Sequence, residues 1–126
     1  MCIRDSNGGE PLYYKGIDRL LKFMSDRSFK IGLTTNLSYD VYNRIISQVP
    51  PDREIDINCS LHPSDKRFDW TMFKSRLKLL VEFGYAVSVN FVGHPDQIML
   101  APEYKSWCED NGCKFELIPF LSLIHI

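Results

Sequence analysis

Gly8-Gly9-Glu10-Pro11, near the start of the chain, has the composition of a loop that binds a small polar ligand. Glycine has no Cβ, so its backbone can approach a ligand closely and adopt positive φ angles. The Glu10 carboxylate would attract an ammonium group, and Pro11 suits the first turn of a helix, which needs no N–H there. The N-terminus of that helix would favour an anionic group. A zwitterionic ligand therefore fits the loop; the alternative is a tight turn that binds nothing.

Two histidines are also candidates for chemistry. His62 and His94 are each followed by proline at the end of a strand pattern, with Asp65 and Asp96 shortly after them. On neighbouring strand ends they could face one cavity as metal ligands, proton donors or substrate contacts. Proline cannot donate a ladder hydrogen bond, so a His-Pro pair can equally be a simple strand terminator. Both interpretations stay open.

The cysteines indicate packing rather than chemistry. Cys108 and Cys113 have no further Cys or His nearby, so they cannot complete a structural zinc site. Cys59 alternates with the apolar residues Ile57 and Leu61. Free cysteines are commonly buried as small apolar side chains, and we expect this of all three. We assign no metal ligand and no catalytic residue.

The elements that position these residues alternate between helix and strand patterns. Helical spacing of apolar residues, with Ile17, Leu20, Leu21 and Met24 on the first inner face, predicts helices at 17–26, 39–49, 69–83 and 102–111, the second capped by Ser38. Strand patterns cover 29–34, 54–61, 85–92 and 114–118. Such repetition is typical of βα units and a parallel sheet. No strand pattern precedes the glycine loop.

Polar residues within two strands separate a barrel from a doubly wound sheet. Asn58 and Ser60, then Ser88 and Asn90, alternate with apolar residues. A sheet covered by helices on both faces would have continuously apolar strands. In a βα barrel alternate residues point inward, and active sites form at the carboxyl ends of the strands. We therefore predict an α/β fold that is a partial (βα) barrel.

Composition narrows the functional class. The chain has 126 residues, a formal net charge of −1 and a pI near 6.3. This charge gives no electrostatic footprint for nucleic acid. No apolar run approaches the roughly 18 residues of a membrane span, and the first residues lack the apolar core of a signal peptide. Four irregularly spaced cysteines form no disulfide framework. We expect a cytoplasmic protein that binds neither nucleic acid nor membrane.

The motifs together resemble the radical S-adenosylmethionine (radical SAM) superfamily. Gly8-Gly9-Glu10-Pro11 is similar to its GGEP motif, which follows the second strand of a partial (βα)6 barrel and binds the amino group of SAM. Thr34-Thr35-Asn36 resembles the end of the third strand, and the later strand patterns match the fourth to sixth. The SAM-binding residues that this resemblance implies are Gly8, Gly9, Glu10, Pro11, Asn36, Ser60, His62 and Asn90.

The family's CxxxCxxC motif, which binds a [4Fe–4S] cluster after the first strand, does not occur here. Residues 1–6 and 121–126 resemble translations of the two strands of one transposase mosaic-end adapter. We therefore expect 1–6 and 121–126 to be adapter-derived, and 7–120 to be part of a radical SAM core domain that retains its third to sixth strands. Cluster ligands are expected in a missing N-terminal part.

The resemblance implies an enzyme that cleaves SAM reductively and generates a 5′-deoxyadenosyl radical. Its cofactors would be SAM and a [4Fe–4S] cluster, and its partners a substrate that the sequence does not identify and an electron donor such as flavodoxin or ferredoxin. Without the cluster motif, this piece alone is expected to be inactive. Two alternatives stay open: a divalent-metal (βα)-barrel hydrolase that uses His62 and His94, and a non-catalytic α/β binding domain.

Overall fold

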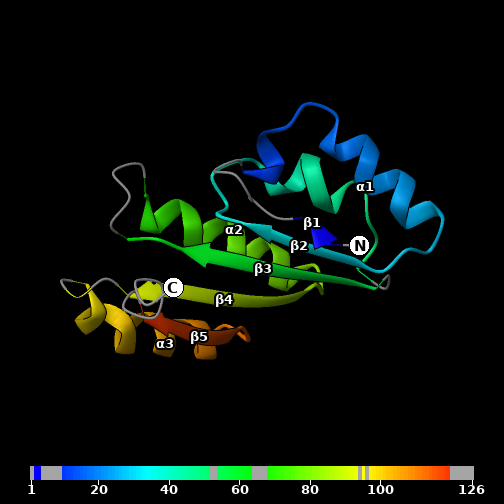
Figure 1. Ribbon diagram of the computed structural model, residues 1–126. Helices are drawn as coiled ribbons and strands as arrows, with labels where there is room; N and C mark the ends of the chain where they lie inside the picture. Colours follow the sequence, from blue (N-terminus) through cyan, green and yellow to red (C-terminus); the bar gives the residue numbers. More distant parts are fainter. Residues whose placement is uncertain are drawn as a thin grey trace.

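Every strand of the sheet runs parallel to its neighbours, and the strands lie side by side in the order of the chain (Figure 1). The computed structural model describes residues 2–3, 10–51, 54–63, 68–93, 95 and 97–119. The strands are β1 (Cys2–Ile3), β2 (Ile31–Thr35), β3 (Ile55–Leu61), β4 (Ala86–Gly93) and β5 (Lys114–Pro119). The helices are α1 (Ile17–Asp26), α2 (Trp70–Glu82) and α3 (Ala101–Asp110). Shorter turns are η2 (Pro11–Tyr13), η3 (Tyr42–Ile46) and η4 (Ile98–Leu100).

The three helices within the described residues pack on one face of the sheet. Parallel strands that follow chain order and are joined by right-handed crossovers place each connecting helix on the same side. Residues of β3 alternate accordingly: Ile57 and Cys59 are buried under the helices, whereas Asn58 and Ser60 on the opposite face are only half-buried. In Figure 1, α1 lies at the β1–β2 end of this layer and α3 beside β5. This singly wound arrangement is that of a partial barrel, as predicted.

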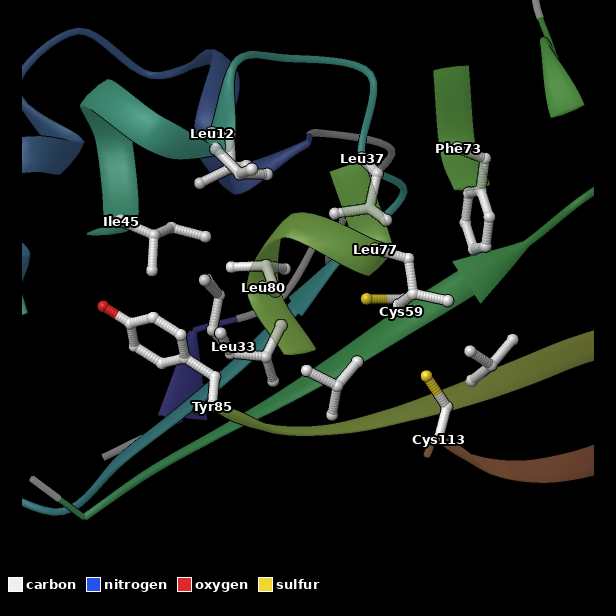
Figure 2. Close-up of a cluster of buried hydrophobic side chains, with 14 of the residues drawn as sticks. Leu12, Leu33, Leu37, Ile45, Cys59, Phe73, Leu77, Leu80, Tyr85 and Cys113 are labelled. Carbon is white, nitrogen blue, oxygen red and sulfur yellow. The ribbon is translucent and has the colours of Figure 1, made fainter. Parts of the chain in front are cut away.

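The core fills the space between the sheet and the helices. Figure 2 shows Leu77 and Leu80 of α2 above Leu33 of β2 and Cys59 of β3. These four side chains are at most 1% exposed. Trp70 at the start of α2 contacts the ring of Tyr104 on α3, with the ring centroids 4.7 Å apart. The predicted strand alternation and helix stripes therefore meet in one continuous core. Among the described residues, no helix has the length and apolar character needed to cross a bilayer.

The predicted helix boundaries agree with the structure to within a residue where capping residues mark them. The Asp69 carboxylate accepts a hydrogen bond from the N–H of Met72 at 3.1 Å and so caps α2. Gly84 follows the helix with a φ of 91°, which glycine adopts without strain. One inner-face assignment is wrong: Leu20 is 44% exposed, whereas Ile17, Leu21 and Met24 are buried. At about 100° per residue, Leu20 lies at the edge of the stripe that these three define.

The predicted helix at 39–49 is shorter than expected. Only η3 forms, as a π-helical turn, with Val41, Ile45 and Val49 buried as predicted. Ser38 was expected to cap this helix, but its hydroxyl donates to the side-chain oxygen of Asn36. Asp40 forms a local turn just before η3, in which its carboxylate accepts a hydrogen bond from the N–H of Tyr42 at 2.9 Å. Because Ser38 pairs with Asn36 within the loop, it does not cap a helix at residue 39, and η3 begins later, at Tyr42.

A strand that the sequence did not predict precedes the glycine loop. Cys2 and Ile3 form β1, parallel to β2, with Cys2 opposite Gly32 and Ile3 opposite Leu33. Two residues are too few for period-two alternation to be detected. The strand expected to begin at residue 29 begins at Ile31, and Phe29 is half exposed.

The cysteines lie in the core, as expected from the sequence. Cys59 and Cys108 are fully buried and Cys113 nearly so. Burial raises the pKa of all three thiols, and that of Cys108 to about 12, because a thiolate is poorly solvated in an apolar interior. Nearby negative charges, Glu10 among them, raise the pKa of Cys59 further. These side chains remain thiols at neutral pH.

We expect the free energy of unfolding to fall as the pH rises above about 9. The unfolded chain ionises its thiols there, near their ordinary pKa, while the folded chain keeps them protonated up to about pH 12 at Cys108. The contribution of each protonated thiol to the free energy of unfolding is therefore fully present below the pKa of the unfolded chain, and it is lost as the pH rises from that value toward the pKa of the folded chain. Urea denaturation should show that the free energy of unfolding falls between pH 8 and pH 10, and Cys108 should contribute on the order of 1 to 2 kcal/mol to this decrease.

The matched control is Cys108→Ala, in which the share of the alkaline loss that this thiol causes should disappear. Burial also raises the pKa of Tyr85 and of Tyr104, but both tyrosines are present in the two proteins, so their effects cancel in the comparison. An identical pH dependence in the two proteins would contradict the assignment.

Candidate functional site

Polar side chains form rows across the sheet face that lies away from the helices. Ser60 of β3 is opposite Asn90 of β4, and two residues earlier Asn58 is opposite Ser88. The Ser88 hydroxyl donates to the side-chain oxygen of Asn58 at 3.4 Å. Successive rows on one face are about 6.7 Å apart along the strands. The row of Ser60 and Asn90 is the nearer of the two to the carboxyl ends of the strands, where βα barrels place their sites.

Both rows extend onto β5, a continuation that the sequence analysis missed. Lys114 is opposite Ser88, and Glu116 is opposite Asn90. Both side chains are exposed. Alternation along 114–118 could have indicated this face, but only the parallel register shows which row each residue joins. The sheet face away from the helices therefore changes from neutral hydroxyl and amide groups on β3 and β4 to charged groups on β5.

Glu10 connects the end of the glycine motif to the end of β2. The Thr35 hydroxyl donates to one carboxylate oxygen of Glu10, and the N–H of Asn36 donates to the other at 3.0 Å. The N–H of Leu12 lies 3.5 Å from the same oxygen as Thr35, so Glu10 also caps η2. Pro11 occupies the first position of this turn, as its fixed φ favours. Residues 25 positions apart in the chain thus meet at the carboxyl end of β2.

The helix dipole expected next to the motif is not where the sequence placed it. The three-residue turn η2 follows Glu10, and α1 begins only at Ile17. The first N–H groups at this place are those of η2, and the Glu10 carboxylate already accepts a hydrogen bond from Leu12. Any attraction for a ligand in this region therefore comes from individual groups and not from a long helix.

Asn36 lies beside Glu10, but its side chain turns toward the following loop. Its amide oxygen accepts hydrogen bonds from the backbone N–H of Ser38, at 3.0 Å, and from the Ser38 hydroxyl. This is the local turn that Asn side chains commonly form. The contact from Asn36 to the rest of the site is made by its backbone N–H, which sequence reasoning had no means to single out.

Leu37 adopts a left-handed conformation with a φ of 59° while its side chain is buried. This region is uncommon for a leucine. Two contacts stabilise it: the N–H of Leu37 donates to the Thr35 hydroxyl oxygen at 3.1 Å, and Arg76 of α2 donates to the Leu37 carbonyl at 2.6 Å. On the neighbouring turn, Arg44 donates to the carbonyl of Leu12. Arginines from α2 and η3 therefore hold the loop after β2 and the turn η2, the two segments that contact the Glu10 carboxylate.

The other predicted site residues are only partly covered by the structure. His62 lies directly after β3 and is half-buried. Gly8, Gly9, His94, Asp65 and Asp96 lie outside the described residues. Within the described ranges no group of three His, Cys, Asp or Glu side chains could hold a metal ion. A hollow of about 380 Å³ between η2, the start of α1 and η3 is lined by none of the predicted site residues.

Comparison with solved structures gives the same fold in SuiB of Streptococcus suis. SuiB bound to S-adenosylmethionine aligns with a TM-score of 0.70 and 22% sequence identity, over 94% of this chain and 29% of that one. SuiB bound to its precursor peptide SuiA aligns with a TM-score of 0.70 and 22% identity, over 94% and 28%. The chain thus spans less than a third of SuiB. No family model and no curated protein matches the chain. At this identity the likeness establishes a shared α/β fold.

We expect Arg76→Met to lower the free energy of unfolding by about 1 to 2 kcal/mol, because the Leu37 carbonyl loses a charged donor. Urea denaturation followed by circular dichroism measures the change. Lys78→Met is the matched control, since Lys78 is exposed on the same helix. An equal loss in both variants would show that the Arg76 contact contributes nothing of its own.

Proposed function

We propose that this chain forms part of the SAM-binding site of a radical SAM enzyme. In the complete enzyme a [4Fe–4S] cluster would allow reductive cleavage of SAM to a 5′-deoxyadenosyl radical. The observation that carries the proposal is the contact of Glu10, from the Gly-Gly-Glu-Pro motif, with the carboxyl end of β2. It brings Glu10 to the carboxyl edge of the parallel sheet, and the row of Ser60 and Asn90 lies toward the same edge.

The described residues suit the polar parts of SAM. The row of Ser60 and Asn90 offers a hydroxyl and an amide, which can hydrogen-bond to ribose hydroxyls or to a carboxylate. Gly8 and Gly9, which precede Glu10 in the sequence, would place backbone carbonyls near the ammonium group of the methionine part. His62 follows Ser60 at the end of the same strand and completes the proposed set. SuiB, which has the same fold, was crystallised with S-adenosylmethionine.

The described cysteines do not suit an iron–sulfur cluster. Cluster ligation requires thiolates, whereas Cys59, Cys108 and Cys113 are buried thiols with raised pKa values. We therefore assign the cluster ligands to a part of the enzyme outside 7–120. The proposal also treats 1–6 and 121–126 as adapter-derived. A flavodoxin or ferredoxin as electron donor, a substrate of undetermined class and a cytoplasmic location belong to the same proposal.

The hydrolase hypothesis requires His62 and His94 to face one cavity, and His94 lies outside the described residues. A non-catalytic binding domain for another ligand would share the fold. The SAM-binding measurement below distinguishes it, because such a domain would not bind SAM.

We expect the chain to bind SAM with a dissociation constant of about 1 mM or tighter in equilibrium dialysis or calorimetry. Ser60→Ala and Asn90→Ala should each weaken binding by roughly threefold to tenfold, because each removes a hydrogen bond worth about 0.5 to 1.5 kcal/mol. Ser75→Ala, an exposed position on α2, should leave the affinity unchanged. Absence of saturable binding by the unsubstituted chain would refute the proposal.

A further inference from the structure

The Glu10 carboxylate contacts two separate parts of the structure at once. One oxygen accepts the Thr35 hydroxyl, and the other accepts the N–H of Asn36 at 3.0 Å. The first oxygen also lies 3.5 Å from the N–H of Leu12 in Glu10's own turn. A carboxylate that joins a turn to a strand end in this way fixes the position of its own backbone. The residues that precede it in the chain are Gly8 and Gly9.

The direction of the Thr35 hydroxyl follows from its neighbours. Thr35 is fully buried, and its oxygen accepts a hydrogen bond from the N–H of Leu37 at 3.1 Å. A backbone N–H can only donate, and an ionised carboxylate can only accept. The single hydroxyl proton must therefore go to Glu10. Thr35 thus orients the carboxylate while its own oxygen holds the left-handed turn at Leu37.

The loop after β2 is braced from the helix layer. Arg76 of α2 donates to the Leu37 carbonyl at 2.6 Å, so the turn is held at both its N–H and its carbonyl. This conformation directs the Asn36 N–H to Glu10. The loop that receives the carboxylate is therefore set by contacts on the side of the sheet away from the polar rows.

We propose that Glu10 and Thr35 are positioning residues: the Thr35 hydroxyl orients the Glu10 carboxylate, and this contact holds the backbone of Glu10, the residue that follows the glycine pair proposed to bind SAM. The inference rests on the proposed function, and it assigns to Glu10 a structural contact in place of the direct ligand role that its charge suggests. SAM affinity then depends on a buried hydroxyl on the helix-facing side of the sheet.

Two substitutions at Thr35 separate positioning from general stability. Thr35→Val keeps the branched shape and removes the hydroxyl, whereas Thr35→Ser keeps the hydroxyl and removes a methyl group from the core. We expect Thr35→Val to weaken SAM binding by about tenfold or more, and Thr35→Ser to change it by less than about threefold. Urea denaturation of both variants gives their stabilities. An affinity loss that follows stability, equal for the two variants, would overturn the inference.

A second measurement needs no ligand. Hydrogen exchange of the Asn36 amide, followed by NMR, should be slow in the unsubstituted chain and about tenfold or more faster in Thr35→Val and Glu10→Gln. The double variant should bind SAM no more weakly than Thr35→Val alone, because both changes act on the orientation of the same side chain at position 10. Additive losses would overturn the inference.

The outcomes distinguish the two proposals. If the unsubstituted chain does not bind SAM, the proposed function fails and this inference fails with it. If it binds SAM and Thr35→Val binds equally well, the proposed function stands and only the positioning role is overturned.

Discussion

Burial of a single face of a parallel sheet is the constraint on which the rest of the structure depends. The described helices α1, α2 and α3 lie on the side of Ile57 and Cys59, so the alternate strand residues on the opposite face need not be apolar. Those positions can carry Asn58, Ser60, Ser88 and Asn90 without burying polar groups in an apolar interior, which would be costly. The candidate site is thus a consequence of one-sided packing, because its residues occupy the positions that the core does not use.

Local signals predicted the elements well because the physics that forms them is local. Alternation at residues 54–61 is produced by the two faces of one strand, and the Asp69 cap and Gly84 lie within a turn of the helix that they bound. Failures arose where a local signal was ambiguous or too short. Ser38 bonded to Asn36 and did not cap a helix. Leu20 lay at the edge of a stripe, where periodicity alone cannot decide exposure. The two-residue β1 carries too short a pattern to be recognised.

Some features of the candidate site could be predicted from local sequence patterns, and others could not. The pairing of Ser60 with Asn90 follows from alternation and a parallel register, so the sequence could indicate it. The partners of Glu10 could not be predicted, since Thr35 and Asn36 are 25 and 26 residues away and one of them contributes only a backbone N–H. The continuation of the rows to Lys114 and Glu116 required the register of the last strand. Long-range contacts through backbone groups leave no signature in residue types.

The half-buried state of the polar rows has a consequence for selectivity. Hydroxyl and amide groups that are neither enclosed nor fully exposed exchange hydrogen bonds with solvent, and a bound molecule must replace those bonds with its own. A molecule that matches them gains little net free energy, but one that leaves a single group unmatched loses roughly 1 to 3 kcal/mol. The face formed by Asn58, Ser60, Ser88 and Asn90 would therefore discriminate mainly by rejecting poorly matched molecules through the cost of dehydration.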